Sequence, residues 1–564
     1  MHLAERFDAV IVGGGHNGLT AAAYLARAGK RVLVLERLDH TGGAAVSERP
    51  FAGVDARLSR YSYLVSLLPQ QIIDDLGLDV RLVRRRYSSY TPDPARPGTG
   101  LLVDNGDDAA TTASLRSIGA EADSGGLTEL HRLVDLVART LWPTVTEPLL
   151  TRSEAQAAVR AAAVGIGMSD ADAEYIWTAM FEQPISAMIE HEATSDLVRG
   201  VVLTDALIGT FARASDERLQ QNICFLYHLI GGGTGDWDVP IGGMGAVTDE
   251  LARAAVEAGA EIRTMAEVTS ITPEHGLVAY VDRAAETDRV VDVDSPYVPQ
   301  PSVVVQGDWI LSGAAPAVLD RLLDSLPKSV EGPIATSPPA PEGAQVKVNL
   351  LVRRLPRLLD PSVDPAAAFG GTFHVNEGWA RLDAAYLEAE AGRIPDPLPL
   401  EIYCHTLSDP TILSPELQAA GAQTLTVFGL HVPHRLAVAA DATPGGHDAF
   451  REELTAAVLR SLDAVLAEPI EDLLLLDTDG RACIETRTTL DLEHSLAMPG
   501  GNIFHGALSW PFLEDDATRV TPAERWGVAT THPRVLLCGA GARRGGAVSG
   551  LGGHNAAKAV LETL

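Results

Sequence analysis

The sequence FDAVIVGGGHNGLTAAAYLARAGKRVLVLERLDHTGGAA, residues 7–45, decides the fold of this chain. Residues 7–12 are a short apolar run with β-branched side chains, which is typical of a buried parallel strand. Gly13, Gly15 and Gly18 follow in the spacing G-x-G-x-x-G. In that spacing the first glycine permits a tight turn, the second lets backbone approach a pyrophosphate, and the third lets the next helix pack closely on the strand.

A helix and a second strand complete this unit. Residues 19–28 are rich in Ala and Leu, and Gly29 provides a natural C-cap. The N-terminus of the helix would direct unbonded N–H groups at a phosphate. Residues 31–35 predict a strand that delivers Glu36 about twenty residues after the glycines, the offset of an acid that accepts ribose hydroxyls. The pattern predicts a dinucleotide-binding βαβ unit, against the alternative of a glycine-rich turn without a ligand.

Two features near this unit favour FAD over NAD. Arg37 and a second glycine pair, Gly42 and Gly43, follow directly after the acid and precede Ala44. Such a pair lets the chain pass close to an extended pyrophosphate and ribityl, although a plain turn is the alternative. No second complete glycine fingerprint follows a predicted strand, since residues 165–170 lack both the strand and the third glycine. A separate NADPH domain is therefore not expected.

The C-terminal segment provides the third argument for FAD. A strand expected at 534–538 runs into the glycine-rich stretch 539–553, and residues 555–564 predict a closing helix. So many glycines at a strand-to-helix junction imply another close backbone approach to a ligand. The residues that we predict to bind the cofactor from these patterns are Gly13, Gly15, His16, Asn17, Gly18, Glu36, Arg37, Gly42, Gly43, Ala44, Gly539, Ala540, Gly546, Ala547 and Val548.

Composition limits the domain count and the class of partner. The chain has 564 residues, enough for two or more domains, and no apolar run approaches the ~18 residues that cross a bilayer. The formal net charge of −31 opposes nucleic acid and anionic lipid. Arg84, Arg85 and Arg86 form a local basic cluster that could touch a lipid headgroup, or could be a solvated loop. Residues 1–8 lack a signal-peptide pattern, so a cytoplasmic location is expected.

The four cysteines exclude dithiol chemistry. Cys224, Cys404, Cys483 and Cys538 are far apart, with no C-x-x-C pair and no Cys/His spacing typical of zinc. Each is most simply a small buried hydrophobic residue. The sequence therefore predicts neither a redox-active disulfide nor a metal site.

Further motifs lie along most of the chain. They are residues 10–45, 59–68, 235–237, 242–245, 409–410, 500–506 and 539–553. In these segments the chain resembles the phytoene desaturase-like branch of the FAD-dependent amine oxidase superfamily. Within that branch it is most similar to the pyridine nucleotide-disulfide oxidoreductase domain-containing protein 2 group and to the desaturase-type carotene ketolases. The chain departs from that pattern at 542–544, where relatives carry Thr-His-Pro, and at 431–434, where they carry a polar aromatic strand.

The resemblance implies an α/β fold. A Rossmann-type FAD-binding domain would be assembled from three chain segments, with an inserted α+β substrate domain and a helical lid, for which residues 127–212 show helical pattern. The ranges are 1–68, 236–318 and 500–564 for the FAD-binding domain, and 69–235 and 319–499 for the substrate domain.

Within the middle segment of the FAD-binding domain, a helix is expected at 246–259 and a strand at 266–268. By resemblance Val268 would offer backbone hydrogen bonds to the adenine, the alternative being a shielded strand valine. Residues 292–301, rich in Pro and Asp, predict a surface hairpin or loop.

Candidate catalytic groups are few. A flavin accepts a hydride at N5, so the protein mainly positions a C–H or N–H bond and excludes water. His505, His431, His434 and His405 lie on substrate-side segments, and no sequence pattern pairs any of them with a carboxylate. Each could equally be structural; His505 ranks first because its segment adjoins the flavin in the resemblance. Residues 47–68 could line the substrate channel or be ordinary core.

We therefore expect an FAD-dependent oxidoreductase that dehydrogenates or oxidises an extended, largely apolar small molecule such as an isoprenoid or a lipid. Oxygen or a quinone would reoxidise the flavin. Oxidation of an amine is an alternative, although the aromatic content of 5% argues against an aromatic cage. The other alternative is a protein that binds flavin for interaction and does not turn over a substrate. Two observations keep it open: Arg543 and Arg544 are unusual at their positions, and the sequence shows no convincing catalytic base.

Overall fold

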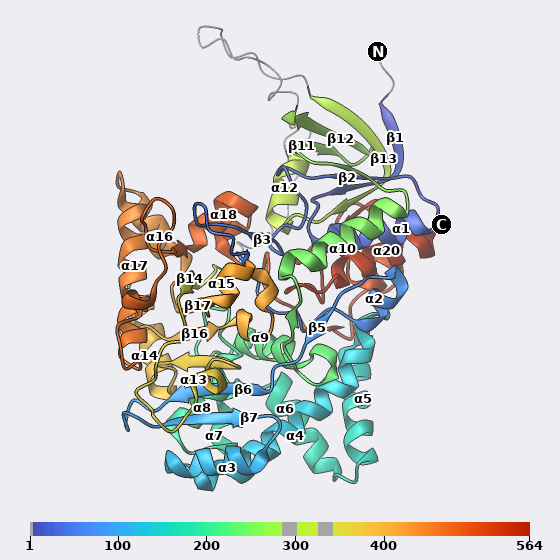
Figure 1. The fold of residues 1–564 in the computed structure, drawn as a ribbon. Helices are drawn as coiled ribbons and strands as arrows, with labels where there is room; N and C mark the ends of the chain where they lie inside the picture. Colours follow the sequence, from blue (N-terminus) through green and yellow to red (C-terminus); the bar gives the residue numbers. More distant parts are fainter. Residues whose placement is uncertain (1–3, 285–301, 325–341) are drawn as a thin grey trace.

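The computed structural model describes residues 4–284, 302–324 and 342–564. Two seven-stranded sheets organise the chain, and Figure 1 shows them in separate regions, with a third, helical region below them. The fold is therefore a mixed α/β fold, as expected. The loop predicted at 292–301 lies outside the described residues.

The first sheet has a parallel core. The apolar runs of the βαβ unit are its central strands, with the order β10-β2-β1-β13 and with β20 on the other side of β13. These strands are β1 (Glu5–Val12), β2 (Val32–Leu35), β10 (Glu261–Arg263), β13 (Val303–Ser312) and β20 (Val535–Leu537). Every residue of β2 is buried, as a continuous run of Val and Leu requires in a sheet covered on both faces. Segments more than 500 residues apart in sequence thus meet in one sheet.

An antiparallel extension and four helices complete this region (Figure 1). Strands β11 (Ala266–Thr272) and β12 (Leu277–Asp282) continue the sheet beyond β13. The helices are α1 (His16–Arg27), α10 (Met244–Glu257), α12 (Pro316–Asp324) and α20 (Leu551–Thr563). The described strands all fall within the ranges expected for the FAD-binding domain, namely 1–68, 236–318 and 500–564.

The closing helix begins earlier than the sequence predicts. It starts at Leu551, so that Gly552 and Gly553 lie inside α20 and not in the glycine-rich turn. A Cβ atom on Gly553 would stand 1.9 Å from the carbonyl oxygen of Asn17, and one on Gly552 would stand 2.5 Å from that of Gly539. These two glycines therefore permit close packing of α20 on α1 and on the preceding strand, which local sequence could not distinguish from a ligand approach.

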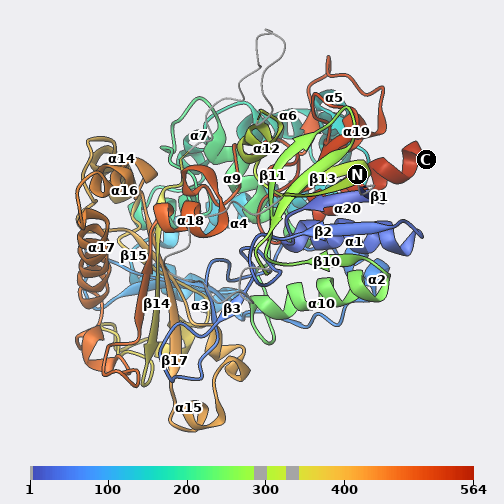
Figure 2. The same cartoon turned by 90° about the horizontal axis from the view of Figure 1, so that it is seen from above.

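The second sheet has the order β18-β14-β17-β16-β15-β6-β7. Its strands are β6 (Tyr87–Pro92), β7 (Gly100–Asp104), β14 (Gln345–Val352), β15 (Thr372–Val375), β16 (Leu400–Tyr403), β17 (Gln423–Leu430) and β18 (Ile484–Arg487). Helices α14 (Trp379–Glu390), α16 (His434–Asp441) and α17 (Gly446–Asp463) lie along one side of it (Figure 2). Leu454, Val458 and Leu462 of α17 form one buried cluster with Val346 and Val348 of β14.

The remaining region is helical, as the pattern of residues 127–212 predicts. Its helices are α3 (Asp108–Ser117), α4 (Ser124–Leu141), α5 (Arg152–Gly165), α6 (Asp170–Phe181), α7 (Ile185–Glu192), α8 (Asp196–Thr204) and α9 (Gln220–Leu229). Trp177 and Phe181 of α6 stack on one another and pack against Phe512, which ties the helices to the C-terminal segment. No helix in the described ranges is both long and apolar enough to cross a bilayer. All four cysteines are buried and unpaired, as expected.

Candidate functional site

A cleft of about 310 Å³ opens at the carboxyl ends of β1 and β2. Residues from all three segments of the first sheet region line it. Of the residues predicted to bind the cofactor, those that line this cleft are Gly13, Gly15, His16, Asn17, Gly18, Glu36, Arg37, Gly43, Ala44, Val268, Gly539 and Ala540. Parallel sheets bind nucleotides at this edge, where the loops after the strands converge.

The two glycine loops are bonded to each other. The N–H of Gly42 donates to the carbonyl oxygen of Gly14 at 2.9 Å, and a Cβ atom on Gly43 would lie 3.2 Å from the Cα atom of Gly15. Gly42 does not line the cleft, so its role is to hold the second loop against the first. The glycine pair that favoured FAD in the sequence thus lies beside the fingerprint, with Gly43 on the cleft wall and Gly42 behind it.

Glu36 stands at the end of β2 with its carboxylate facing the fingerprint. One carboxylate oxygen accepts from the N–H of Gly14 at 2.7 Å and the other from the N–H of Leu38 at 2.8 Å. Each oxygen retains a second lone pair, and the side chain lines the cleft. The carboxylate is therefore fixed in place to accept hydroxyl groups from a ligand.

Several polar atoms in the cleft lack a partner within the described protein. Nε2 of His16, Oδ1 of Asn17 and Nδ1 of His505 are buried and unbonded. Helix α1 begins at His16 with no side-chain cap at Gly15, which leaves its first N–H groups directed into the cleft. Burial lowers the pKa of both His16 and His505 to about 4, so both rings are neutral near pH 7. The unbonded histidine nitrogens, which can donate a hydrogen bond, and a bare helix N-terminus fit a phosphate-bearing ligand, and Oδ1 of Asn17 is free to accept from a ligand hydroxyl or N–H.

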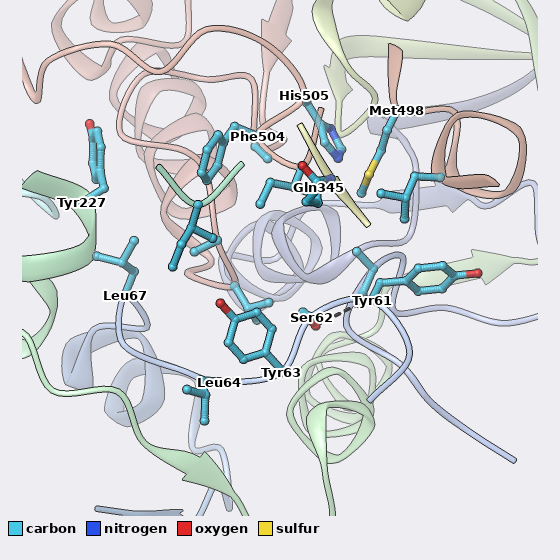
Figure 3. A pocket seen from close by; sticks show the side chains of 18 of the residues that line it. Tyr61, Ser62, Tyr63, Leu64, Leu67, Tyr227, Gln345, Met498, Phe504 and His505 are labelled. Atoms are coloured by element: carbon cyan, nitrogen blue, oxygen red, sulfur yellow. Dashed lines mark hydrogen bonds between the residues drawn. The ribbon is translucent and has the colours of Figure 1, made fainter. Parts of the chain in front are cut away.

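A second cavity, of about 120 Å³, adjoins the cleft. The residues common to both cavities are His16, Ala44, Met498, His505 and Ala540. In Figure 3, His505, Met498 and Gln345 face Tyr63, Leu64 and Leu67 across this pocket. Its other apolar lining residues include Ile208, Tyr227, Trp237, Phe428, Ile503, Phe504 and Leu508. The predicted cofactor residues Gly546, Ala547 and Val548 line this second cavity, not the cleft.

The segment 59–68 forms one wall of the apolar pocket. Ser62 donates from its N–H and its hydroxyl to the carbonyl oxygen of Ala44, at 3.2 and 2.9 Å, which holds the segment against the second glycine loop. Tyr63 packs on Phe428 with a ring separation of 4.5 Å. Of the two interpretations of residues 47–68, the structure thus places Arg60–Leu64 and Leu67 on the pocket wall. Helices α5–α7 contribute none of the residues that line either cavity.

Lys347 is a pocket residue that sequence reasoning missed. Its side chain is buried, and its ammonium donates to the carbonyl oxygens of Ser59 and Tyr61 at 2.8 and 2.9 Å. It lies over the rings of Tyr63 and Phe428, and burial lowers its pKa to about 7. The signal in the sequence was a lone charged residue inside the largely apolar strand QVKVNLLV of β14.

The candidate histidines separate into two groups. His505 lines both cavities. His431 packs instead against Phe211 and Tyr386, and His405 lies among the rings of Tyr63 and Tyr403 without lining either cavity.

His434 also lies apart from both cavities. Its Nε2 is 3.1 Å from a carboxylate oxygen of Glu493. No sequence pattern pairs His434 with Glu493, because the two residues are 59 positions apart and meet only in the tertiary fold.

The two unusual arginines have structural partners. Arg544 is buried and donates to the carbonyl oxygens of Thr144 and Glu147 at 2.6 and 2.7 Å. Arg543 donates to those of Trp510 and Phe512. Neither arginine lines the cleft or the apolar pocket. Arg544 holds the C-terminal loop against the helical region, and Arg543 holds it against residues 510–512 of the C-terminal segment, so neither side chain faces the cofactor cleft.

Comparisons with known proteins agree with this geometry. Residues 11–70 match the model of the NAD(P)-binding Rossmann-like domain family. The chain is 56% identical over 560 residues to the uncharacterized protein Rv0897c of Mycobacterium tuberculosis, covering 99% of this chain and 97% of that protein. It is 28% identical over 597 residues to pyridine nucleotide-disulfide oxidoreductase domain-containing protein 2 of Rattus norvegicus, covering 100% of this chain and 94% of that relative.

A solved structure extends the likeness in fold. Cyclohexylamine oxidase from Brevibacterium oxydans matches with a TM-score of 0.52 at 15% sequence identity, and the match covers 99% of each chain. The likeness in fold therefore extends over the whole chain and is not confined to the nucleotide-binding unit.

Proposed function

This chain belongs to the family of the mycobacterial protein Rv0897c, and from that premise we propose that it is an FAD-dependent oxidoreductase acting on an extended, largely apolar molecule. The observation that supports the proposal most strongly is the joining of two cavities at His505, one with nucleotide-binding geometry and one lined by apolar side chains. When bound, the flavin supplies a hydride acceptor, and the protein supplies position and exclusion of water.

The cleft residues would hold the adenosine and pyrophosphate of FAD. Glu36 would accept ribose hydroxyls, the N-terminus of α1 would face the pyrophosphate, and Val268 would adjoin the adenine. Because residues 546–548 line the apolar pocket, the cofactor would extend past His505 into that pocket. A nicotinamide dinucleotide does not require this extension, which is why we favour FAD although the matching family model is described by NAD(P) binding.

An apolar substrate suits the remaining part of the pocket better than an amine. The aromatic pair Tyr63 and Phe428 is the observation that favours amine oxidation, because such rings attract a substrate cation. However, the ammonium of Lys347 already lies over both rings, at 5.7 and 5.1 Å from their centres. The side chain of Lys347 therefore already occupies the position that a substrate amine would take over these rings, so an isoprenoid or lipid chain is the better candidate.

Lys347 is also the group we propose to exchange a proton with the substrate. With its pKa lowered to about 7 by burial, the amine is neutral in a large fraction of molecules near neutral pH and can accept a proton. Burial lowers the pKa of His505 to about 4, which makes its ring a weaker base than the Lys347 amine. We propose that oxygen or a quinone then takes the electrons from the reduced flavin.

Anaerobic reduction tests the function. The FAD-loaded protein would be mixed without oxygen with three substrate sets: apolar isoprenoids, long-chain lipids and primary amines. We expect loss of the oxidised flavin absorbance with an apolar set and not with amines. Reduction by amines alone would replace the proposal with amine oxidation, and a bound flavin that no set reduces would favour an interaction protein without turnover.

A further inference from the structure

A cluster of one histidine and two glutamates lies in the second sheet, away from the cleft. His374 of β15 stands directly opposite Glu401 of β16, and Glu377 follows two residues after the end of β15. One potential ligand atom of each side chain lies within 4.8 Å of those of the other two. Antiparallel pairing places His374 and Glu401 on the same face of the sheet, so the backbone itself fixes their separation.

The three side chains are buried but incompletely bonded. Their exposed fractions are 4% for His374 and 1% for each of Glu377 and Glu401. One oxygen of Glu377 accepts from the Thr204 hydroxyl at 2.6 Å and pairs with Nδ1 of His374. One oxygen of Glu401 accepts from the Tyr403 hydroxyl at 2.8 Å. The second oxygen of each glutamate has no hydrogen-bond partner in the described protein, which is unusual for a buried carboxylate.

The surrounding charges do not neutralise this pair. Asp205 adds a third acid, and its carboxylate and that of Glu377 both lie close enough to interact with the charge of Glu401. Arg85, a half-buried cation whose charge also acts on Glu401, donates to the carbonyl oxygen of Trp237 and to the hydroxyl of Thr372, and to no carboxylate of the described residues. Two buried carboxylates beside each other need either a shared proton or a cation.

We propose that His374, Glu377 and Glu401 bind one divalent first-row transition-metal ion. One oxygen of each glutamate and one imidazole nitrogen provide a mixed oxygen and nitrogen ligand set, which suits Zn²⁺, Mn²⁺ or Fe²⁺ better than Ca²⁺ or Mg²⁺. A double positive charge would balance the two glutamates, and the remaining coordination positions would take water. The sequence concealed this site because its ligands are joined only by strand pairing.

A polar cavity gives the site access to solvent. The cavity has a volume of about 170 Å³ and reaches from the exposed Arg84 to His374. Asp205, His228 and Thr204 also line it, so its inner end can hold a hydrated ion. The residues that line both this cavity and the apolar pocket are Tyr63, Leu64, Ile208, His228 and Trp237. The metal would therefore stabilise the sheet behind the pocket wall and would not contact the cleft that we assign to FAD.

Metal analysis and binding test the proposal. Protein stripped with a chelator would be dialysed against Mn²⁺ or Zn²⁺, and bound metal would be measured by plasma mass spectrometry. We expect one ion per chain in the unmutated protein and at least a tenfold weaker retention in Glu401→Gln. The matched control is Glu493→Gln, because Glu493 pairs with His434 at 3.1 Å and no third potential ligand joins them among the described residues. That variant should retain the metal.

Three results would overturn the proposal: no binding of either metal by folded protein, equal retention in Glu401→Gln and the unmutated protein, or an equal loss in Glu493→Gln. Should Glu401→Gln fail to fold, Glu377→Gln takes its place, and the electron paramagnetic resonance spectrum of Mn²⁺ is recorded with the unmutated protein. Protein ligands broaden the six-line spectrum of the hydrated Mn²⁺ ion. A spectrum of hydrated Mn²⁺ alone would refute the site. Flavin content, measured on the same samples, is expected to be the same with and without metal, so this test does not depend on the proposed function.

Discussion

Gly15→Ala separates the binding of the cofactor from the stability of the fold. Gly15 has φ −71° and ψ 171°, which any L-residue adopts, and a Cβ atom there would meet no protein atom closer than the Cα of Gly43 at 3.9 Å. The added methyl group would instead point into the cleft where we place the pyrophosphate. By contrast, a Cβ atom on Gly18 would lie 2.1 Å from the carbonyl oxygen of Gly13.

The two substitutions should therefore act on different quantities. Alanine lowers the entropy of the unfolded chain but is a poorer N-cap than glycine, and these opposing effects leave the free energy of unfolding of Gly15→Ala within about 1 kcal/mol of the original. Forcing a methyl group into a tight contact costs about 1 to 3 kcal/mol, which corresponds to an FAD affinity about 5- to 150-fold weaker. Gly18→Ala should instead lower the melting temperature, with or without FAD.

Flavin titration and thermal unfolding measure the two effects. Apoprotein would be titrated with FAD while the quenching of flavin fluorescence is followed, and the melting temperature of each apoprotein would be recorded by circular dichroism. Unchanged FAD affinity in a folded Gly15→Ala protein would refute the assignment of the fingerprint to the pyrophosphate. A large loss of apoprotein stability in Gly15→Ala would refute the packing argument.

Three further predictions test other parts of the site. Glu36→Gln should weaken FAD binding by about 1.5 to 3 kcal/mol in a fluorescence titration, because a charge-assisted hydrogen bond to the ribose is lost, whereas Glu250→Gln, which loses a bond to the N–H of Asp79, should not. Leu67→Phe should narrow the apolar pocket and slow flavin reduction by long substrates in stopped-flow experiments while the flavin content stays unchanged. Burial lowers the pKa of Lys347 to about 7, so the unfolded chain binds one more proton than the folded chain between about pH 7 and 10.4. The free energy of unfolding should therefore rise with pH by up to ~5 kcal/mol across that window. Lys347→Met should lack that rise in urea titrations, and an identical pH dependence in both proteins would contradict the lowered pKa.

The local parts of the site could be predicted from sequence because each depends on a short pattern. Strand β1, helix α1, strand β2 and Glu36 follow one another within residues 5–36, so period, glycines and offset were enough. Twelve of the predicted residues line the cleft, and Gly42 is hydrogen-bonded to Gly14 behind its wall. The error at Gly552 and Gly553 arose because glycine serves close helix packing as well as ligand approach.

The catalytic side could not be predicted because it depends on contacts between distant strands. His431 and His434 lie in the expected segment, yet the turn of the chain after β17 directs them away from both cavities. Lys347 enters the pocket because β14 lies beside residues 59–61, a pairing that no local pattern indicates. The pairing of His374 with Glu401 across two strands is hidden for the same reason.

Extraction of the bound cofactor tests the central claim most directly. The purified protein would be denatured in acid and the released small molecules identified by mass spectrometry, with a second sample first reconstituted in excess FAD and desalted. The account predicts FAD, close to one per chain after reconstitution. Folded protein that yields neither FAD nor a fragment of it after reconstitution would contradict the account.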